Sequence, residues 1–320
     1  MIALSYMENV KFISVDWGTS NFRLNLVDYN LNVVKTIQTN NGIKSIAENL
    51  NKINGNHVDI FLNYIKNQLK KIEIFNNSVP IIISGMASSS IGIEELPYVK
   101  IPISINANNL IIKYLPNSIL THPIILVSGI KSQDDVMRGE EIQLFGLYQD
   151  LKIKEKCVFV FPGTHCKHIY CENGLLTNFK TQMTGEMFDI ICNHSILSGS
   201  ISTGLLNARA IDAFKHGVNL VNTSNSILNT LFSIRTNTLF GHKDNKENFY
   251  ILSGLLIGEE LSAINTKNQI VLCAENSLYD LYKLAISQLG LSSNTIFVEQ
   301  EKVKKSVIMG HNQVFKILEL

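Results

Sequence analysis

Alternating and continuous runs of apolar residues divide the chain into two similar halves. Near the N-terminus, β-branched residues and turns rich in Gly and Asn predict three strands, at residues 11–16, 22–27 and 33–37. From Cys157 the same succession begins again, with strands expected at 158–161, 165–171 and 175–180. Two copies of one supersecondary unit, each followed by helices and further strands, predict two similar α/β domains.

Helices and buried strands are expected after each group of three strands. Apolar residues at spacings of three and four predict a helix over 57–72, and the apolar runs 79–84 and 124–127 are typical of buried strands. Asp134 or Asp135 is expected to cap a helix that carries Glu140 and Glu141. In the second half, we expect helices at 185–197, at 251–264 and from Ser277 to Gly290, with polar surface loops near 222–226 and 236–247.

The polar stretch 148–156, just before the pattern restarts, is the best candidate for a domain boundary. It predicts an N-terminal domain over 1–150 and a C-terminal domain over 151–320, with the option that the last helix returns to the first domain. A cleft between two such domains is a favoured ligand site.

The two halves share a Gly-Thr turn after their first strand. Gly18-Thr19 and Gly163-Thr164 lie 145 residues apart and follow strands of the same kind. Glycine allows close approach to the backbone, and clustered N–H groups with a hydroxyl form a site suited to phosphate. An ordinary hairpin would show the same residues at either turn alone. Because the turn recurs in the matching place, the sequence favours a phosphate site, gripped by one turn from each domain.

Asp16 ends the first strand, immediately before the first turn. A carboxylate there could hold Mg²⁺ directly or through water, because this ion prefers oxygen ligands and keeps several waters. The alternative is an Asp that only stabilises the turn. Phe161 occupies the matching position of the second half, so a metal role cannot be symmetrical.

Six motifs follow one another along the chain: DWGTSNFR, SGMASSSIG, DDVMRGEEIQLFG, FPGTHCKHI, MTGE followed by NHSIL, and LSGLLIGEEL. Together they resemble the 2-dehydro-3-deoxygalactonokinase family of the sugar kinase, actin and heat-shock chaperone superfamily. The motifs run from residue 12 to about residue 260. The resemblance implies two ribonuclease-H-like (actin-like ATPase) domains with an interdomain cleft that holds ATP and Mg²⁺. It also implies transfer of a phosphoryl group to the C6 hydroxyl of 2-dehydro-3-deoxy-D-galactonate.

A base near the acceptor hydroxyl is required, and Asp16, Glu140 and Glu141 are the candidates. By resemblance, Asp16 anchors Mg²⁺. The segment RGEE is similar to an acidic turn of exopolyphosphatase-like relatives that activates the nucleophile, and Glu140 follows Gly139 at the expected helix start. Glu140 is therefore favoured as the base. Glu141 lies about 100° further round the helix and is expected to have a buried, orienting role. A surface acidic pair is the alternative.

The resemblance also implies residues that bind substrate and nucleotide. The Arg138 guanidinium could pair with the sugar-acid carboxylate, or it could form an internal salt bridge. Family members have Gly-Trp where this chain has Gly92-Ile93, so an aromatic floor under the sugar is not expected. The sugar site is expected at Gly85, Met86, Ser88 and Ser89, and ATP or phosphate contacts at Gly18, Thr19, Ser20, Asn21, Gly163, Thr164, His165, Lys167 and Gly254. Ordinary turns and helix packing are the alternatives for these residues.

A zinc site in the segment HCKHIYC is a rival prediction, because His and Cys are the preferred ligands of zinc. In a strand, however, His165 and Cys171 would share one face far apart, while Cys166 and His168 would point to the other. Cys192 and His194 lie further along the chain. The sequence therefore disfavours zinc. A non-catalytic nucleotide sensor is disfavoured by Asp16 and the Glu pair, whereas a kinase of a related keto sugar acid or of a polyol stays open.

Charge and composition restrict the partners. With 28 basic and 27 acidic residues the net charge is +1, so no nucleic-acid partner is expected. No apolar run reaches the roughly 18 residues that a membrane span needs, and the N-terminus does not show a signal-peptide pattern. Five cysteines indicate free thiols in the cytoplasm. A homo-oligomer is left open, and small molecules are the expected partners.

Overall fold

The computed structural model describes residues 9–50, 56–72, 79–116, 119–151, 153, 156–223 and 226–319. The chain forms two compact units. The first unit comprises Met1–Leu151, Gly174–Thr177 and Lys304–Leu320, and the second comprises Lys152–Asn173 and Asn178–Val303. The C-terminal segment therefore packs with the first unit.

The first unit is built on a mixed sheet. Its strands β1 (Val10–Trp17), β2 (Phe22–Asp28) and β3 (Val33–Thr39) form the antiparallel group expected from the sequence. On the other side of β1, β4 (Ile81–Gly85) and β8 (Ile124–Val127) run parallel to it, and β7 (Ile112–Leu115) closes the order β3-β2-β1-β4-β8-β7.

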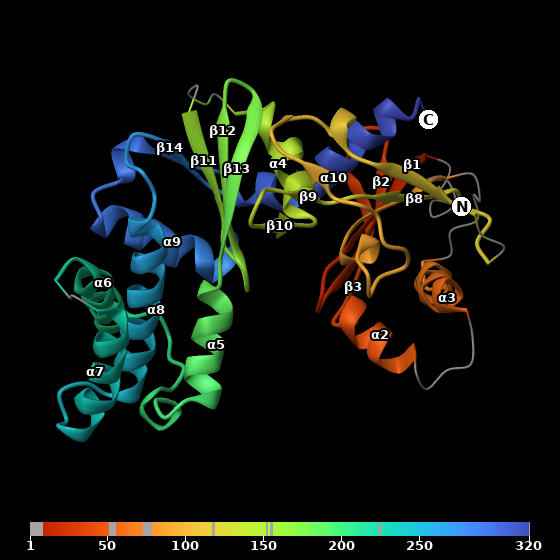
Figure 1. Cartoon of the computed structure of the whole chain (residues 1–320). Helices are drawn as coiled ribbons and strands as arrows, with labels where there is room; N and C mark the ends of the chain where they lie inside the picture. Colours follow the sequence, from red (N-terminus) through yellow and green to blue (C-terminus); the bar gives the residue numbers. More distant parts are fainter. Residues whose placement is uncertain are drawn as a thin grey trace. The chain divides into compact units, whose positions relative to one another are not determined.

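Alternating residues of β1 supply two different faces of this sheet. Ile13, Val15 and Trp17 face the core formed with α3 (His57–Lys70), and α2 (Ile43–Leu50) lies on the same side (Figure 1). Phe12 faces α10 (Gln300–Ile317), whose Phe315 ring centroid lies 5.7 Å from its own. Helices thus cover both faces, as a sheet with parallel neighbours requires.

Glycines bring α4 (Glu140–Tyr148) close to α10. A Cβ on Gly146 would lie 2.0 Å from the Ser306 carbonyl oxygen, and one on Gly310 would lie 2.2 Å from that of Ile142. No side chain fits at either position without moving a backbone. The C-terminal helix is therefore held against the helix that carries Glu140.

The prediction that Asp134 or Asp135 caps this helix is wrong. The Ser132 hydroxyl oxygen accepts the Asp135 N–H at 2.9 Å, and this turn leads into β10 (Val136–Met137). β10 pairs with β9 (Ile130–Lys131), which pairs with β5 (Val99–Lys100). The helix begins four or five residues later than expected, after Gly139, because the Asp pair serves a strand turn.

The second unit repeats the sheet order of the first. β11 (Lys156–Phe161), β12 (Cys166–Glu172) and β13 (Leu175–Gln182) are the expected strands, and β14 (Gln269–Leu272) and β15 (Thr295–Phe297) run parallel to β11. The order β13-β12-β11-β14-β15 matches β3-β2-β1-β4-β8. This strand order confirms the prediction of two ribonuclease-H-like folds. The short β6 (Ile103–Ser104) pairs with the start of β13, whose first residues belong to the first unit.

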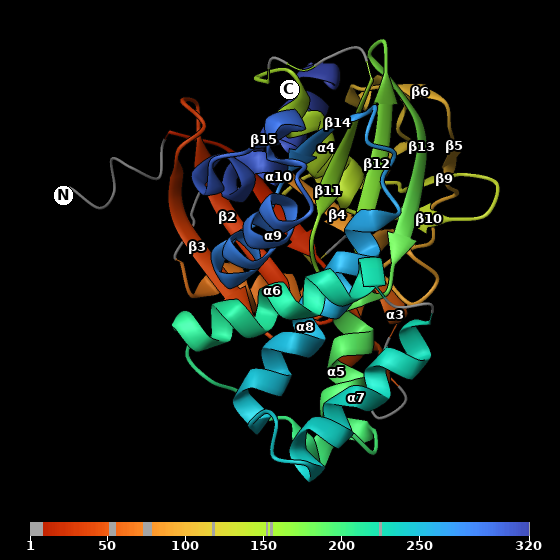
Figure 2. The ribbon, with the colours of Figure 1, turned by 90° about the vertical axis from the view of Figure 1, so that its left-hand side faces the viewer.

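Helices of the second unit surround the buried α8 (Asn245–Ser262). α6 (Ala208–Thr223) crosses α8 (Figure 2). The two helices approach closely at Gly217, where a Cβ would lie 2.2 Å from the Ile251 carbonyl oxygen. The other helices are α5 (Thr184–His194), α7 (Ile227–Leu239) and α9 (Asn276–Gln288), with short 3₁₀ turns at Met86–Ser88 (η1), Ala107–Asn109 (η2), Ser198–Ser200 (η3) and Ser292–Asn294 (η4).

Two details of the second unit differ from expectation. The predicted loop at 236–247 is largely the end of α7 and the start of α8, where Asp244 and Glu247 form a capping box. Polar residues are common at helix ends because they satisfy free backbone groups. A stretch that contains two helix ends therefore has the polar composition of a loop. Glu275 rather than Ser277 occupies the N-cap position of α9. Of the loop expected at 222–226, residues 224–225 lie outside the described residues.

Within the described residues, no helix combines the length and the apolar character needed to span a membrane.

Candidate active site

The first glycine turn joins β1 to β2 and is held from behind by the start of α2. The Gly18 N–H donates to the Asn21 carbonyl at 2.9 Å, which closes the turn. The Gly42, Ile43 and Lys44 N–H groups donate to the carbonyls of Ser20, Gly18 and Thr19 at 3.0–3.2 Å. A Cβ on Gly42 would lie 2.1 Å from the Thr19 carbonyl oxygen, so this approach requires glycine. The sequence motifs did not single out Gly42.

Asp16 lies at the end of β1, next to this turn. Its neighbours in register are Arg23 on β2 and Ser84 on β4. The side chain is half-buried, and burial raises the pKa of its carboxyl, partly offset by the positive charge of Arg23. A carboxylate that has lost part of its hydration gains from a cation nearby.

The loop expected to hold the sugar, η1, follows β4. Gly85 has φ +87°, and a Cβ there would lie 2.8 Å from the Trp17 carbonyl oxygen. Ser88 and Ser89 are buried, and the Ser89 hydroxyl donates to the Met86 carbonyl at 2.7 Å. Both serines thus help to shape the loop.

Arg138 crosses this loop from the end of β10. Its Nη1 donates to the Ser88 hydroxyl at 2.6 Å and its Nη2 to the Leu96 carbonyl at 2.9 Å. The guanidinium lies 4.0 Å from the centre of the Tyr98 ring. Among the described residues, its buried Nε has no hydrogen-bond partner. The structure brings Arg138 to the expected sugar site, where two of its nitrogens hold the loop.

Glu140 and Glu141 begin α4 and differ in environment. Glu140 is half-buried, whereas Glu141 is 1% exposed, and both Glu141 carboxylate oxygens lie 2.9 Å from the Gly139 nitrogen. Burial, and next the negative charge of Glu140, raise the pKa of Glu141 to about 8. At neutral pH the Glu141 carboxyl therefore holds its proton, while Glu140 is the more accessible carboxylate at the helix N-terminus.

Gly139, which precedes this pair, has φ +114°, a region that favours glycine. A Cβ on Gly139 would lie 3.6 Å from the Gly85 Cα. The start of α4 therefore lies against the start of the η1 loop, so the candidate base and the candidate sugar loop are neighbours within the first unit.

The second glycine turn joins β11 to β12 and is held by α5. The Glu186 N–H donates to the Thr164 carbonyl at 3.0 Å, and His165 Nε2 lies 2.5 Å from the Glu186 carboxylate. A Cβ on Gly185 would lie 2.4 Å from the Gly163 carbonyl oxygen. Gly185 thus supports the second turn as Gly42 supports the first. A second glycine after the third strand of each half is the sequence signal that could have found both.

A pocket of about 420 Å³ lies beside the second turn. Its walls are mostly apolar, with a few hydroxyl groups. A Cβ on Gly163 would meet no protein atom within 4 Å, so the fold itself does not require glycine there. The pocket is lined by Gly163, Cys166, Thr184, Gly185, Phe188, Thr203, Gly204, Phe249, Tyr250, Ser253, Leu256, Ile257, Ser277, Leu278, Leu281 and Tyr282.

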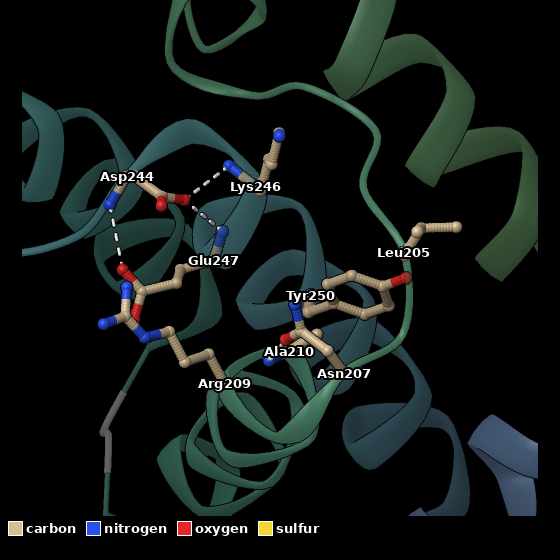
Figure 3. A pocket seen from close by; sticks show the side chains of 8 residues that line it. All are labelled: Leu205, Asn207, Arg209, Ala210, Asp244, Lys246, Glu247 and Tyr250. Atoms are coloured by element: carbon tan, nitrogen blue, oxygen red, sulfur yellow. Dashed lines mark hydrogen bonds between the residues drawn. The ribbon is translucent and has the colours of Figure 1, made fainter.

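A second pocket, of about 290 Å³, is also lined by Tyr250 and lies at the N-termini of α6 and α8 (Figure 3). The capping box of Asp244 and Glu247 lines it, together with exposed Arg209 and Lys246. The Tyr250 hydroxyl donates to the Gly204 carbonyl at 2.7 Å and so holds the loop whose residues line the two pockets.

Two predicted nucleotide residues have other neighbours in the structure. Gly254 faces α6, where a Cβ would lie 2.1 Å from the Phe214 carbonyl oxygen, and it does not line the larger pocket. Lys167 is 6% exposed at the start of β12. A nucleotide contact of either residue stays a prediction.

The His and Cys residues of the segment 165–171 have separate neighbours. His165 lies in the turn, Cys166 contacts Tyr282, His168 pairs with Glu260, and Cys171 lies opposite Cys157 in the sheet. In the part of the chain that the structure describes, no group of three or more His, Cys, Asp or Glu side chains is arranged so that it could hold a metal ion.

Two ribonuclease-H-like folds, each with a glycine turn after its first strand, define the class of actin-like ATPases and sugar kinases. Within this class, the family model for 2-keto-3-deoxy-galactonokinase matches residues 16–306. The chain belongs to the 2-keto-3-deoxy-galactonokinase family, and the resemblance found in the motifs is confirmed.

Individual relatives agree with this family. The 2-dehydro-3-deoxygalactonokinase of Escherichia coli (strain K12) is 26% identical over 284 residues, which cover 88% of this chain and 90% of the relative. DgoK1 of Rhizobium meliloti (strain 1021), a candidate enzyme of the same name, is 28% identical over 298 residues, covering 90% and 93%. A crystal structure of a candidate 2-dehydro-3-deoxygalactonokinase from Sinorhizobium meliloti matches with a TM-score of 0.80 and 27% identity, covering 97% of each chain.

Proposed function

We propose that this protein is an ATP-dependent kinase that phosphorylates 2-dehydro-3-deoxy-D-galactonate at its C6 hydroxyl. The observation that carries this proposal beyond family membership is the pocket beside the second glycine turn. It joins an apolar cavity to backbone groups suited to phosphate, which is the combination that a nucleotide needs. Neither a polyol kinase nor a non-catalytic sensor is favoured by any feature of the structure.

The second unit binds ATP in this proposal. The adenine base and the ribose occupy the pocket between α5, α8 and α9, while the phosphates lie against Gly163, Thr164 and His165. The open space beside Gly163 supports this placement, since a glycine that the fold does not require leaves room for a ligand to approach the backbone. Lys167 and Gly254 remain candidates for further contacts, and the first turn (Gly18, Thr19, Ser20 and Asn21) is a second candidate for phosphate.

The first unit binds the sugar acid. Gly85, Met86, Ser88 and Ser89 form the loop, and Arg138 supplies the positive charge that a carboxylate seeks. Because the Arg138 Nη groups already donate to Ser88 and Leu96, its contribution to the substrate is charge together with the shape of the loop.

Glu140 is the general base in this proposal. Phosphoryl transfer depends mainly on positioning and on neutralising charge, and a carboxylate accepts the proton of the acceptor hydroxyl. Glu140 is half-buried beside the sugar loop, whereas Glu141 is tied to Gly139 and protonated at neutral pH. Glu141 therefore orients the start of α4, and Asp16 remains the third candidate.

Mg²⁺ is expected to accompany ATP, and Asp16 is the residue proposed to hold it. The chemistry of the site fits the ion. The Asp16 carboxylate is half-buried, burial raises its pKa, and a bound cation would stabilise its charged form. One carboxylate suffices, since Mg²⁺ usually keeps several waters and takes further oxygens from phosphate. The ion would neutralise charge on the phosphates.

The direct test is a coupled assay of ADP release with ATP, Mg²⁺ and 2-dehydro-3-deoxy-D-galactonate. The gluconate epimer and simple polyols serve as comparators, and phosphorus NMR of the product identifies the phosphorylated hydroxyl. ADP release with none of these acceptors would refute the kinase proposal, and a preference for a comparator would change the substrate. The cytoplasmic location and a homo-oligomer remain expectations of the sequence, to be examined by fractionation and by sedimentation.

A further inference from the structure

A buried carboxylate lies behind the second glycine turn, outside the residues assigned above. Glu260, on α8, is 4% exposed and does not line the larger pocket. Its Oε1 lies 2.9 Å from His168 Nε2, and its Oε2 accepts the Tyr282 hydroxyl at 2.8 Å and also the Thr184 hydroxyl. Three donors from three other elements, β12, α5 and α9, therefore meet on one side chain of α8.

The protons of this group can be placed. Among the described residues, the buried Nδ1 of His168 has no hydrogen-bond partner. His168 Nε2 faces the Glu260 carboxylate and donates to it, so Glu260 acts as acceptor for all three neighbours.

From Tyr282 the contacts continue to the turn. Its hydroxyl oxygen lies 3.3 Å from Cys166 Sγ, and this sulfur accepts the Gly163 N–H at 3.4 Å and donates to the Gly163 carbonyl at 3.3 Å. Burial raises the pKa of the Cys166 thiol to about 11, and burial and then Glu260 raise the pKa of Tyr282 well above its usual value. Both groups keep their protons at neutral pH and can donate.

A second route reaches the same turn through α5. Thr184, bound to Glu260, precedes Gly185, whose Cα approaches the Gly163 carbonyl, and the following Glu186 N–H donates to Thr164. Both sides of the second turn are therefore fixed by neighbours of Glu260.

We infer that Glu260 is a positioning residue for phosphate binding: through Tyr282 with Cys166, and through Thr184, it holds the Gly163–Thr164 backbone in the form that receives the nucleotide phosphates. This inference rests on the proposed function, since it assumes that the turn binds phosphate. Glu260 does not contact the adenine base in this proposal, because it does not line the pocket. A backbone that is fixed before the ligand arrives loses little freedom on binding, and small displacements of such groups are costly.

The test compares ATP with adenosine by calorimetry in Glu260→Gln and Tyr282→Phe. Both changes keep size and remove one charge or one hydroxyl. We expect ATP affinity to fall about tenfold or more, as when a charge-assisted hydrogen bond is lost. Adenosine affinity should change less than about twofold in Glu260→Gln, because Glu260 does not line the pocket proposed for the base and ribose. In Tyr282→Phe, whose ring stays in that pocket, adenosine affinity should fall less than ATP affinity. Glu259→Gln, an exposed neighbour on the same helix, is the control and should leave both affinities unchanged.

A conservative series separates positioning from simple stability. Cys166→Ser keeps a donor and an acceptor beside Gly163 and should retain most of the ATP affinity, whereas Cys166→Ala should lose it. If Glu260→Gln does not fold, Tyr282→Phe and the Cys166 pair decide the question.

Parallel losses for ATP and adenosine, or unchanged ATP affinity in the folded variants, would overturn this role of Glu260 and leave the kinase proposal standing. A wild-type protein that binds ATP no more tightly than adenosine would also overturn it. A wild-type protein that binds neither ligand would instead refute the nucleotide site itself.

Discussion

At the residue scale, two adjacent carboxylates at the start of α4 have opposite surroundings. Glu140 is half-buried and follows Gly139, which lies against the η1 loop, whereas Glu141 is buried against the Gly139 backbone. The sequence predicted this difference, because Glu141 shares a helical face with Leu144 and Phe145. It could not predict the Glu141–Gly139 contact, since that depends on the positive φ of Gly139.

Replacing Glu140 by Gln removes the proposed base while keeping the side chain's size. We expect turnover to fall about 10²- to 10⁴-fold, the usual contribution of a general base, with ATP affinity nearly unchanged. Steady-state kinetics and calorimetry measure the two quantities. Unchanged turnover would transfer the role of base to Glu141 or Asp16.

The raised pKa of Glu141 predicts a pH dependence of stability. Its pKa is about 8 in the folded protein against about 4.5 when unfolded, so the folded state binds the extra proton between these values. Its contribution is complete below about pH 4.5 and is lost as the pH rises through 8, by up to about 1.4 kcal/mol per pH unit.

Chemical denaturation of Glu141→Gln should therefore show a shallower loss of stability from pH 6 to 9 than the wild type shows. Glu140→Gln provides the comparison, because it removes one like charge and leaves the buried acid in place. Identical slopes in the wild type and Glu141→Gln would contradict the raised pKa.

At the element scale, the start of a helix supports each glycine turn. Gly42 before α2 and Gly185 in α5 both approach turn carbonyls more closely than any side chain allows. The strands that flank the turns were predicted from alternation and β-branched residues. The supporting glycines were not, because a glycine needed for contact between distant segments resembles any other glycine in a sequence.

A methyl group at Gly185 should displace the second turn. Its Cβ would lie 2.4 Å from the Gly163 carbonyl oxygen and 2.8 Å from the Thr164 Cα, so one backbone must move. We expect Gly185→Ala to weaken ATP binding by about tenfold or more, since displaced binding groups lose much of their effect. Gly199→Ala is the matched control, because its Cβ would meet nothing within 4 Å. Equal ATP affinity in the two variants would show that α5 does not set the turn.

At the scale of the whole molecule, the recurrence of one strand pattern sufficed to predict two ribonuclease-H-like folds. The convergence of His168, Thr184, Glu260 and Tyr282 could not be predicted in this way. These residues lie up to 114 positions apart and belong to four elements, and periodicity reports only the face that a residue occupies within its own element. A similar limit applies to Gly254, where the sequence could not distinguish contact with a ligand from contact with α6.

The first unit is closed by residues from the two ends of the chain. His311 on α10 is fully buried, with Nδ1 2.8 Å from the Ser14 hydroxyl and Nε2 2.9 Å from that of Ser84. Burial lowers its pKa to about 3. The C-terminal helix is thus joined to β1 and β4 by an uncharged histidine.

His311 should make the protein sensitive to acid. Its pKa is about 6.5 in the unfolded chain and about 3 in the folded one, so the unfolded state binds more protons between these values. Stability should fall as the pH drops from about 6 towards 3, with His311 contributing up to about 1.4 kcal/mol per pH unit. Denaturant titrations of His311→Gln should show a flatter decline, and a slope equal to that of the wild type would exclude this role.

The paired glycines also show where the two halves differ in length. The turns lie 145 residues apart, but Gly42 and Gly185 lie only 143 apart. The missing two residues are found between the second and third strands. β2 and β3 are joined by residues 29–32, whereas β12 and β13 are joined by Asn173-Gly174, both with positive φ, the two-residue connection that tight hairpins prefer. Two residues at this hairpin tip can be gained or lost without moving either glycine turn, so an alignment of the halves places its gap there.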